Sequence, residues 1–172
     1  ELKKILDSNQ NYLVELNYDI KLLSKYSSKE IDNVIRKNLK AELTLITLEQ
    51  TALKVACNYL AGITEHKYFI KAPIEIFEKQ KYFKLLNDIF KTEKLKDNIV
   101  FVFAFDDVCE SKKTLATIKE NNYLTAVNNV GTLKINRSTF ENFDYAFVSS
   151  QFLELYEGYQ EIWYAKGIKF II

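Results

Sequence analysis

The stretch Leu124-Thr125-Ala126-Val127-Asn128-Asn129-Val130-Gly131-Thr132 guides the interpretation of the whole chain. Its first four residues have the length and apolar composition of a short buried strand. The strand runs directly into Asn128-Asn129, and a loop that contains Gly131 follows. The pattern therefore predicts a strand over 124–127 that delivers two adjacent amide side chains to a glycine-containing loop.

Strands and helices are expected to alternate on both sides of this stretch. The run Ile99–Phe105 is apolar without alternation, which is typical of a strand buried on both faces. Asn121-Asn122 and Gly167 are expected to end helices, because both residue types tolerate the left-handed cap conformation. Further strands are predicted at residues 14–20, 31–35, 68–72, 145–148 and 168–172, and helices at 1–10, 48–63, 76–90, 112–120 and 152–166.

Strands that alternate with helices of this length indicate βα units and a parallel sheet. Periodicity alone leaves both a doubly wound sheet and a closed barrel open. No Gly-x-Gly-x-x-Gly follows any strand, which weakens a dinucleotide-binding fold. We expect residues 1–11 to be a linker helix from an upstream region and residues 12–172 to be one domain. The chain contains no Met, so we expect it to be a piece of a longer protein.

Composition narrows the class of protein. The chain has 172 residues, of which 48% are hydrophobic, and this favours a globular domain over disorder. Its formal net charge of +1 shows no basic excess, so nucleic acid is not an expected partner. No apolar run approaches the roughly 20 residues of a membrane span. Cys57 and Cys109 match no metal-site spacing and are expected to be reduced thiols, and His66 is expected to lie in an exposed loop.

The order of these segments resembles that of EAL-type cyclic-di-GMP phosphodiesterase domains. In that family the strand at 124–127 leads into Asp-Asp-Phe-Gly-Thr-Gly, and its aspartates belong to the metal site. Here both positions are Asn. The signature Glu-Ala-Leu-x-Arg falls on Asp32-Asn33-Val34-Ile35-Arg36, so the metal-binding Glu is shortened to Asp32 and the phosphate-contacting Arg is kept as Arg36. A salt bridge from Arg36 to Asp32 or a nearby carboxylate is the structural alternative.

Other positions of the family pattern are also changed. The metal-binding Asn corresponds to Lys71, and the mid-strand Glu corresponds to Phe103 or Ala104. The family's Asp-Tyr-Leu-Lys-Ile-Asp falls on residues 144–149, which replaces the catalytic Lys by Phe147 and the following Asp by Ser149. The terminal Glu of the third metal strand corresponds to Asp106 or Asp107, which on a strand would point to opposite faces; a loop-start or helix-cap pair is the alternative.

The resemblance implies an EAL-like (β/α) TIM-type barrel, either complete or lacking its last two strands, which are absent from this chain. Hydrolysis by Mg²⁺ or Mn²⁺ needs anionic oxygen ligands, and the changes above remove several of them. We therefore expect a protein that is not an enzyme and holds no metal cofactor. The expected role is a regulatory or protein-interaction module in cytoplasmic bacterial signalling. The alternative is a receptor that binds cyclic-di-GMP without cleaving it, through Arg36, Asp32, Asn128, Asn129 and Gly131.

An aromatic face is predicted on the helix at 152–166. Tyr156, Tyr159 and Trp163 lie at helical spacing on one side. Packing against the barrel is one interpretation. A surface for a dimer or protein partner is the other, since aromatic residues are enriched in interfaces. We expect at least one of these three rings, with Trp163 as the first choice, to be partly exposed and to contribute to such a contact.

Overall fold

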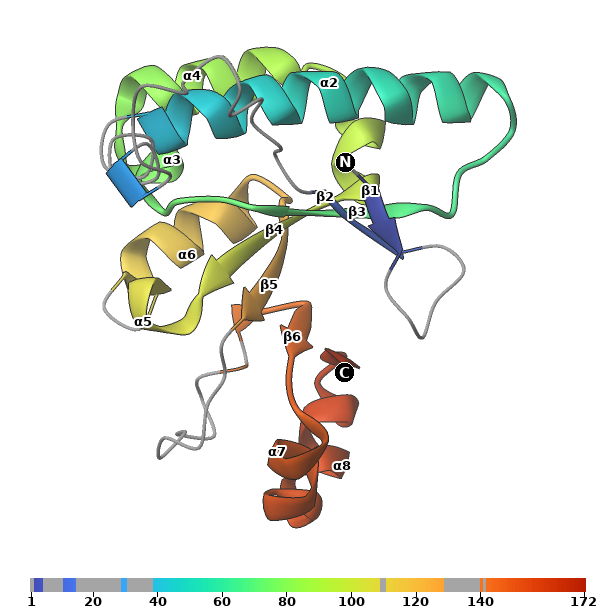
Figure 1. The fold of residues 1–172 in the computed structure, drawn as a ribbon, viewed down its shortest axis with the longest axis vertical. Helices are drawn as coiled ribbons and strands as arrows, with labels where there is room; N and C mark the ends of the chain where they lie inside the picture. The colour runs from blue at the N-terminus through green and yellow to red at the C-terminus, as the bar shows by residue number, and fades with distance from the viewer. Residues whose placement is uncertain are drawn as a thin grey trace.

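The computed structural model describes residues 2–4, 11–14, 29–30, 39–108, 111–128, 140 and 142–172. Strands and helices alternate along most of this length, as periodicity predicts (Figure 1). The strands are β1 (Leu2–Lys4), β2 (Asn11–Val14), β3 (Lys67–Lys71), β4 (Ile99–Ala104), β5 (Leu124–Asn128), β6 (Tyr145–Phe147) and β7 (Lys169–Ile171). The helices are α2 (Lys40–Leu60), α3 (Glu75–Glu78), α4 (Gln80–Ile89), α5 (Phe105–Val108), α6 (Lys112–Glu120), α7 (Ser150–Leu155) and α8 (Glu157–Ala165), with a 3₁₀ helix, η3, at Glu93–Asn98.

The strands form one sheet whose spatial order follows the sequence, from β1 to β7. Strands β2 to β7 are parallel, whereas β1 pairs antiparallel with β2. A doubly wound sheet reverses its strand order at a switch point, and this sheet does not. The parallel strands instead form the half-barrel that a (β/α) barrel requires. Within the part of the chain that the structure describes, β1 and β7 are the two edges of the sheet.

The sheet buries apolar side chains on both faces. Strand β4 shows this most clearly, because Phe101 and Phe103 lie in a cluster with the helices while Val100 and Val102 lie in a separate cluster on the other face. The expectation of a doubly buried strand at 99–105 is confirmed for residues 99–103, all of which are buried. The helix-facing cluster is the larger, and the second cluster fills the inner face of the half-barrel with Phe69, Val100, Val102, Ala126, Tyr145 and Ile171.

The curvature of the sheet is visible in aromatic contacts between strands that are not neighbours. The ring of Phe69 on β3 meets Tyr145 at 5.1 Å and Phe147 at 5.5 Å between centroids, both in edge-to-face geometry. Tyr145 and Phe147 belong to β6, and β4 and β5 lie between β3 and β6. Rings on β3 and β6 can meet in this way only if the sheet curls around its inner face.

Local backbone signals largely agree with the sequence. Asn122 ends α6 with φ of 58°, and Gly167 follows α8 with φ of 81°. The backbone N–H of Gly167 donates to Tyr164 and that of Ile168 donates to Trp163, which is the Schellman pattern of a helix end. Two predicted helices are each divided. Lys79 has an extended ψ of 116° and separates α3 from α4, and Tyr156 separates α7 from α8.

Some expectations are wrong. Residues 2–4 form strand β1 and not part of a helix, because they pair with β2 and complete an edge of the sheet. Helix α2 begins at Lys40, eight residues before the predicted start. The helix also ends at Leu60, three residues before its predicted end. The predicted strand at 31–35 and most of the predicted strand at 14–20 lie outside the described residues.

The expected exposure of Trp163 is also wrong. Its side chain is 2% exposed and lies between Phe140, at 4.9 Å between ring centroids, and Phe170 of β7, at 5.6 Å. Tyr156 and Tyr159 are half-buried and pack against the same core. The three rings do share one face of the helix, and that face turns toward the sheet. Trp163 is therefore a core residue, whereas Tyr156 and Tyr159 keep part of their surface exposed.

Replacing Trp163 by Ala should lower the free energy of unfolding by about 3–5 kcal/mol, the range for removing a buried aromatic ring. Tyr164→Ala is the matched control, since Tyr164 neighbours Trp163 but is 54% exposed, and it should change stability much less. Urea unfolding followed by circular dichroism measures both. Equal effects of the two substitutions would contradict the buried position of Trp163.

Candidate functional site at the carboxyl edge of the sheet

The carboxyl ends of the parallel strands meet at one edge, which is where ligands bind in barrels and open α/β sheets. Side chains that alternate with the helix-facing core point to the inner face of the half-barrel. At the ends of four neighbouring strands these inner positions are Lys71 on β3, Ala104 on β4, Asn128 on β5 and Phe147 on β6. These four residues define the carboxyl-edge site.

The strand register resolves the one-residue ambiguity on β4. Ala104 pairs directly with Asn128 across β4 and β5. Phe103 is fully buried in the helix-facing core, where it meets Phe77 at 5.9 Å between ring centroids. Of the two candidate positions on β4, the one that faces the site is therefore Ala104, whose side chain is a methyl group.

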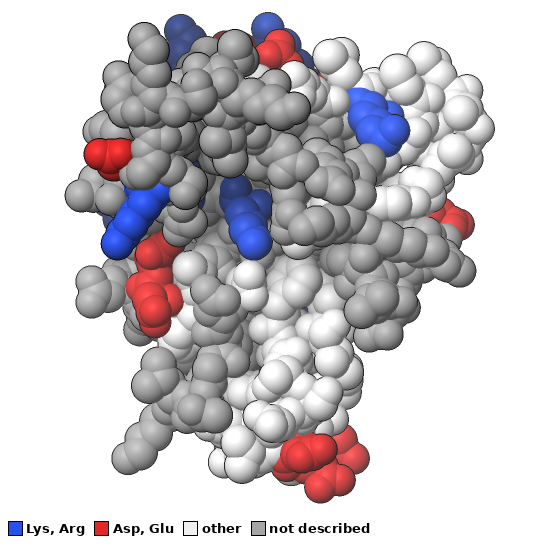
Figure 2. Space-filling model, in the orientation of Figure 1, with Lys and Arg blue, Asp and Glu red and all other residues white. Residues whose placement is uncertain are grey.

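The charge of the site is set by its side chains. Lys71 is exposed, while Asn128 and Phe147 are half-buried. The Phe147 ring is held against Phe69 on the inner face. The four side chains thus comprise a cation, a methyl group, an amide and an aromatic ring, and none is a carboxylate. On the face that Figure 2 shows, acidic and basic side chains of the described residues are scattered and do not form a patch of one sign.

Asp106 and Asp107 follow β4 but do not continue it as a strand. Both lie in the first turn of α5, and both are exposed. Carboxylates are favourable in the first turn of a helix, which agrees with the helix-cap interpretation of the pair. Among the described residues, no three His, Cys, Asp or Glu side chains gather as a metal site would require.

Two other residues of the family pattern have structural partners. Ser149 is the N-cap of α7, and its hydroxyl oxygen accepts from the backbone N–H of Phe152 at 3.1 Å. Asp144 lies at the opposite, amino edge of the sheet. Its carboxylate accepts from the backbone N–H of Thr125 at 2.8 Å and from the Thr125 hydroxyl at 3.1 Å, which ties β5 to the start of β6.

Two lysines and two aspartates lie at the amino edge of the sheet: Lys67, Lys169, Asp97 and Asp144. Burial, together with the charge of Lys169, lowers the pKa of Lys67, although Asp97 opposes that shift. Lys67 Nζ also donates to the backbone carbonyl of Asp97. Burial, with a smaller contribution from Asp144, raises the pKa of Tyr145, and Lys169 Nζ lies 5.7 Å from the Tyr145 ring centroid.

Of the predicted ligand-binding residues, the structure describes Asn128, which ends β5 at the carboxyl edge. Asp32, Arg36, Asn129 and Gly131 lie outside the described residues. Among the predicted interface residues, Trp163 is buried in the helix-facing core, and Tyr156 and Tyr159 are partly buried against it. Sequence reasoning missed one feature, a line of apolar side chains on the outer side of α2, although their seven-residue spacing is visible in the sequence.

Comparison with known proteins identifies the architecture. No protein-family model and no curated protein sequence matches the chain. Among solved structures, a FimX EAL domain superposes with a TM-score of 0.74 at 13% identity, covering 93% of this chain and 71% of that one. The FimX EAL domain of Pseudomonas aeruginosa bound to c-di-GMP gives a TM-score of 0.67 at 13% identity, covering 95% and 72%.

A longer protein has the same fold. The EAL enzyme Bd1971, in its form with cAMP and cyclic-di-GMP bound, superposes with a TM-score of 0.70 at 11% identity. The match covers 94% of this chain and 50% of Bd1971, so the chain spans half the length of that protein. None of the helices formed by described residues is long and apolar enough to cross a membrane. The comparisons agree with the alternating strands, the sequential sheet and the inner-face register: this chain has the fold of the EAL domains.

Proposed function

We propose that this chain is a catalytically inactive EAL-like domain that acts in bacterial signalling as a regulatory, protein-interacting module. The observation that carries the proposal is the composition of the carboxyl-edge site, with Lys71, Ala104, Asn128 and Phe147 on neighbouring strands. A divalent ion at this edge would lie beside a lysine ammonium and would find a methyl group where the family pattern has a carboxylate. Hard cations need anionic oxygens, and these four side chains offer one amide oxygen.

The replacement of a catalytic Lys by Phe147 also supports the proposal. The ring of Phe147 packs edge-to-face on Phe69 and adds to the inner core. A phenyl ring neither transfers a proton nor carries charge. At this position the side chain therefore contributes to packing and cannot take part in catalysis.

The first test is enzymatic. The protein should release no linear product from cyclic-di-GMP with either Mg²⁺ or Mn²⁺, because the ligands that would bind and activate water at the metal are replaced. Product measured by chromatography should stay at the level of a protein-free control. Turnover that is proportional to protein concentration and survives repurification would refute inactivity.

Restoring negative charge tests the metal argument directly. A variant with Ala104→Glu, Asn128→Asp and Ser149→Asp should bind Mn²⁺ in calorimetry more tightly than the natural sequence. The matched control is Gln50→Glu, Gln80→Glu and Gln151→Glu, which adds the same charge at exposed positions and should leave Mn²⁺ binding unchanged. Equal Mn²⁺ affinity of the two variants would mean that these positions do not form the metal site.

Ser149 allows a separate test of whether its position is structural. Ser149→Ala should lower the free energy of unfolding by about 0.5–2 kcal/mol, since it removes the N-cap of α7. Ser149→Asp should retain most of the stability, because Asp also caps helices well. Thermal unfolding distinguishes the two variants. A Ser149→Ala variant as stable as the natural protein would show that the cap contributes nothing.

Binding of cyclic-di-GMP without cleavage is the second candidate function. The exposed Lys71 ammonium at the carboxyl edge favours it, because a cation there can attract a phosphate, and the similar FimX domain of Pseudomonas aeruginosa has c-di-GMP bound. Arg36 is the charged residue that the family resemblance retains for a phosphate contact.

Titration of the purified protein with cyclic-di-GMP by calorimetry distinguishes the two candidates. If the nucleotide binds, Arg36→Ala should weaken binding by about 1.5–3 kcal/mol, the value of a hydrogen bond to a charged group. Lys29→Ala is the control, because Lys29 is a basic residue that precedes the Asp32–Arg36 motif in the sequence. This substitution should have little effect on binding. If only the Lys29→Ala variant loses the heat of cyclic-di-GMP binding, the nucleotide binds at a site that does not include Arg36.

A further inference from the structure

The outer side of helix α2 carries a line of exposed apolar side chains, which we call the apolar stripe. The stripe consists of Leu39 at the N-cap and Ile46, Leu53 and Leu60 within the helix, which are 44%, 50%, 65% and 90% exposed, respectively. Each member follows the previous one by seven residues. Such a spacing keeps side chains on nearly one line of a helix, and it is the spacing that a second helix packs against.

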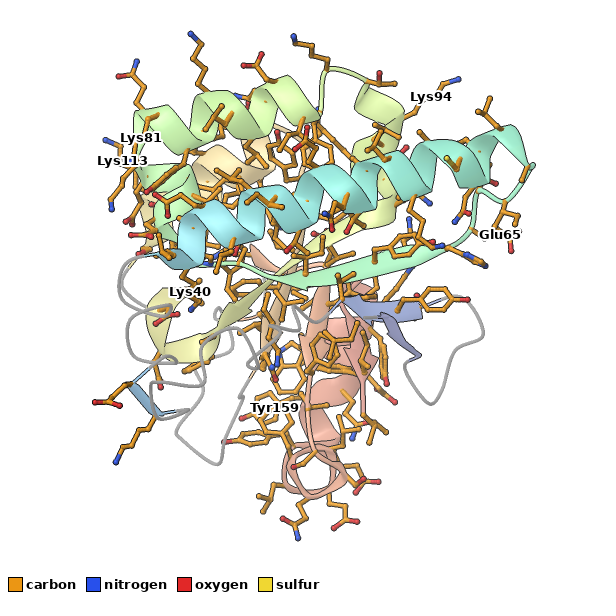
Figure 3. The ribbon with its side chains drawn as sticks, turned by 45° about the horizontal axis from the view of Figure 1, so that its top comes forward. Lys40, Glu65, Lys81, Lys94, Lys113 and Tyr159 are labelled. Atoms are coloured by element: carbon orange, nitrogen blue, oxygen red, sulfur yellow. The ribbon has the colours of Figure 1, made fainter. Side chains whose placement is uncertain are left out.

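A groove runs beside the stripe, between α2 and α4. The two helices point the same way, because Lys40 and Lys81 lie at the same end of the pair (Figure 3) and Glu42 near the start of α2 meets Lys81 near the start of α4. The groove has a cavity volume of about 590 Å³. Its apolar lining includes Leu45, Ile46, Ala52, Leu53, Leu85 and Ile89.

The groove carries negative charge. Its lining includes Glu42, Glu49 and Asp88, and none of its lining residues is Lys or Arg. A hydrogen bond from the Tyr82 hydroxyl lowers the pKa of the Glu42 carboxyl. Lys81 approaches Glu42 at 3.9 Å and Lys91 approaches Asp88 at 3.5 Å. These exposed ion pairs contribute little stability, so a cation from a partner can replace either lysine.

We propose that the α2–α4 groove is a docking site for one amphipathic helix from a partner protein, with Leu or Ile along one face and Lys or Arg beside them. The stripe and the groove supply the apolar contact, and the three carboxylates supply the charge that selects a basic helix over an acidic one. Helix α2 has 21 residues, which at 1.5 Å per residue offers roughly 30 Å of contact.

A second copy of this chain fits the groove less well. A parallel copy of α2 would place Glu42 and Glu49 opposite their own equivalents. An antiparallel copy centred on the stripe would bring two Glu49 side chains together at the two-fold axis. Like charges in such contacts oppose association, which favours a basic helix as the occupant.

Two synthetic peptides of about 18 residues, long enough for roughly five helical turns, test the proposal by fluorescence anisotropy. One repeats Leu and Lys with helical periodicity, and the other has Glu at every Lys. The Leu-Lys peptide should bind the natural protein at least about tenfold more tightly than the Leu-Glu peptide, as a groove with three carboxylates requires. Equal affinity of the two peptides, or no binding of either, would overturn the proposal.

Variants of the protein locate the contact. Ile46→Glu and Leu53→Glu should abolish binding of the Leu-Lys peptide, whereas Leu155→Glu, at a leucine of α7 that is 66% exposed, should leave it unchanged. Glu49→Lys should weaken binding about three- to tenfold, as expected for reversing one exposed charge, and Glu154→Lys is its control. All these positions are exposed, so circular dichroism should show folded protein. Binding that survives both stripe variants would contradict the assignment.

Sedimentation equilibrium provides the remaining test. The natural protein should not form dimers through the α2–α4 groove. A concentration-dependent dimer that Leu53→Glu dissociates, without binding of either peptide, would assign the groove to a second copy and overturn the proposal.

The groove gives the proposed interaction module a contact surface. A protein that binds the Leu-Lys peptide and also hydrolyses cyclic-di-GMP would refute the proposed function and leave the docking site in place.

Discussion

Phe69 constrains the shape of the whole molecule. Its ring is fully buried on the inner face of the sheet and contacts Tyr145 and Phe147. Three inter-strand spacings separate β3 from β6, which in a flat sheet would be roughly 14 Å. The observed centroid separations of 5.1 and 5.5 Å require the sheet to curl. The helices then lie on the outside of the curve, and the carboxyl ends of the strands converge.

The same aromatic contact links packing to the proposed loss of chemistry. A site that holds a metal ion needs room, water and charge on its inner face. Phe147 instead adds apolar area to the inner cluster, and the inner position at the end of β4 holds the methyl group of Ala104. In the proposed inactive domain, these two side chains leave their positions without polar groups that would need partners.

The sequence predicts features that depend on neighbouring residues better than those that depend on distant ones. The doubly buried strand at β4, the strand ending at Asn128 and the caps at Asn122 and Gly167 follow from local apolar runs and from backbone conformation. The burial of Trp163 does not, because helical spacing shows which residues share a face but not which way the face turns. Likewise, β1 is short and polar, and only its pairing with β2 makes it a strand. For the site, the family resemblance located Asn128, and the register across β4 and β5 was needed to choose Ala104 over Phe103.

The sequential order of the sheet has a consequence for how the molecule is assembled. From β3 onward, each strand pairs with the strand that precedes it along the chain. The connections from β3 to β4, from β4 to β5 and from β6 to β7 each contain at least two helices, and each joins strands that pair directly with one another. Closing short loops costs little chain entropy, and folding rates rise when contacts are local in sequence. During synthesis, each new strand can add to a template that is already formed, so the half-barrel can grow in the order in which it is translated.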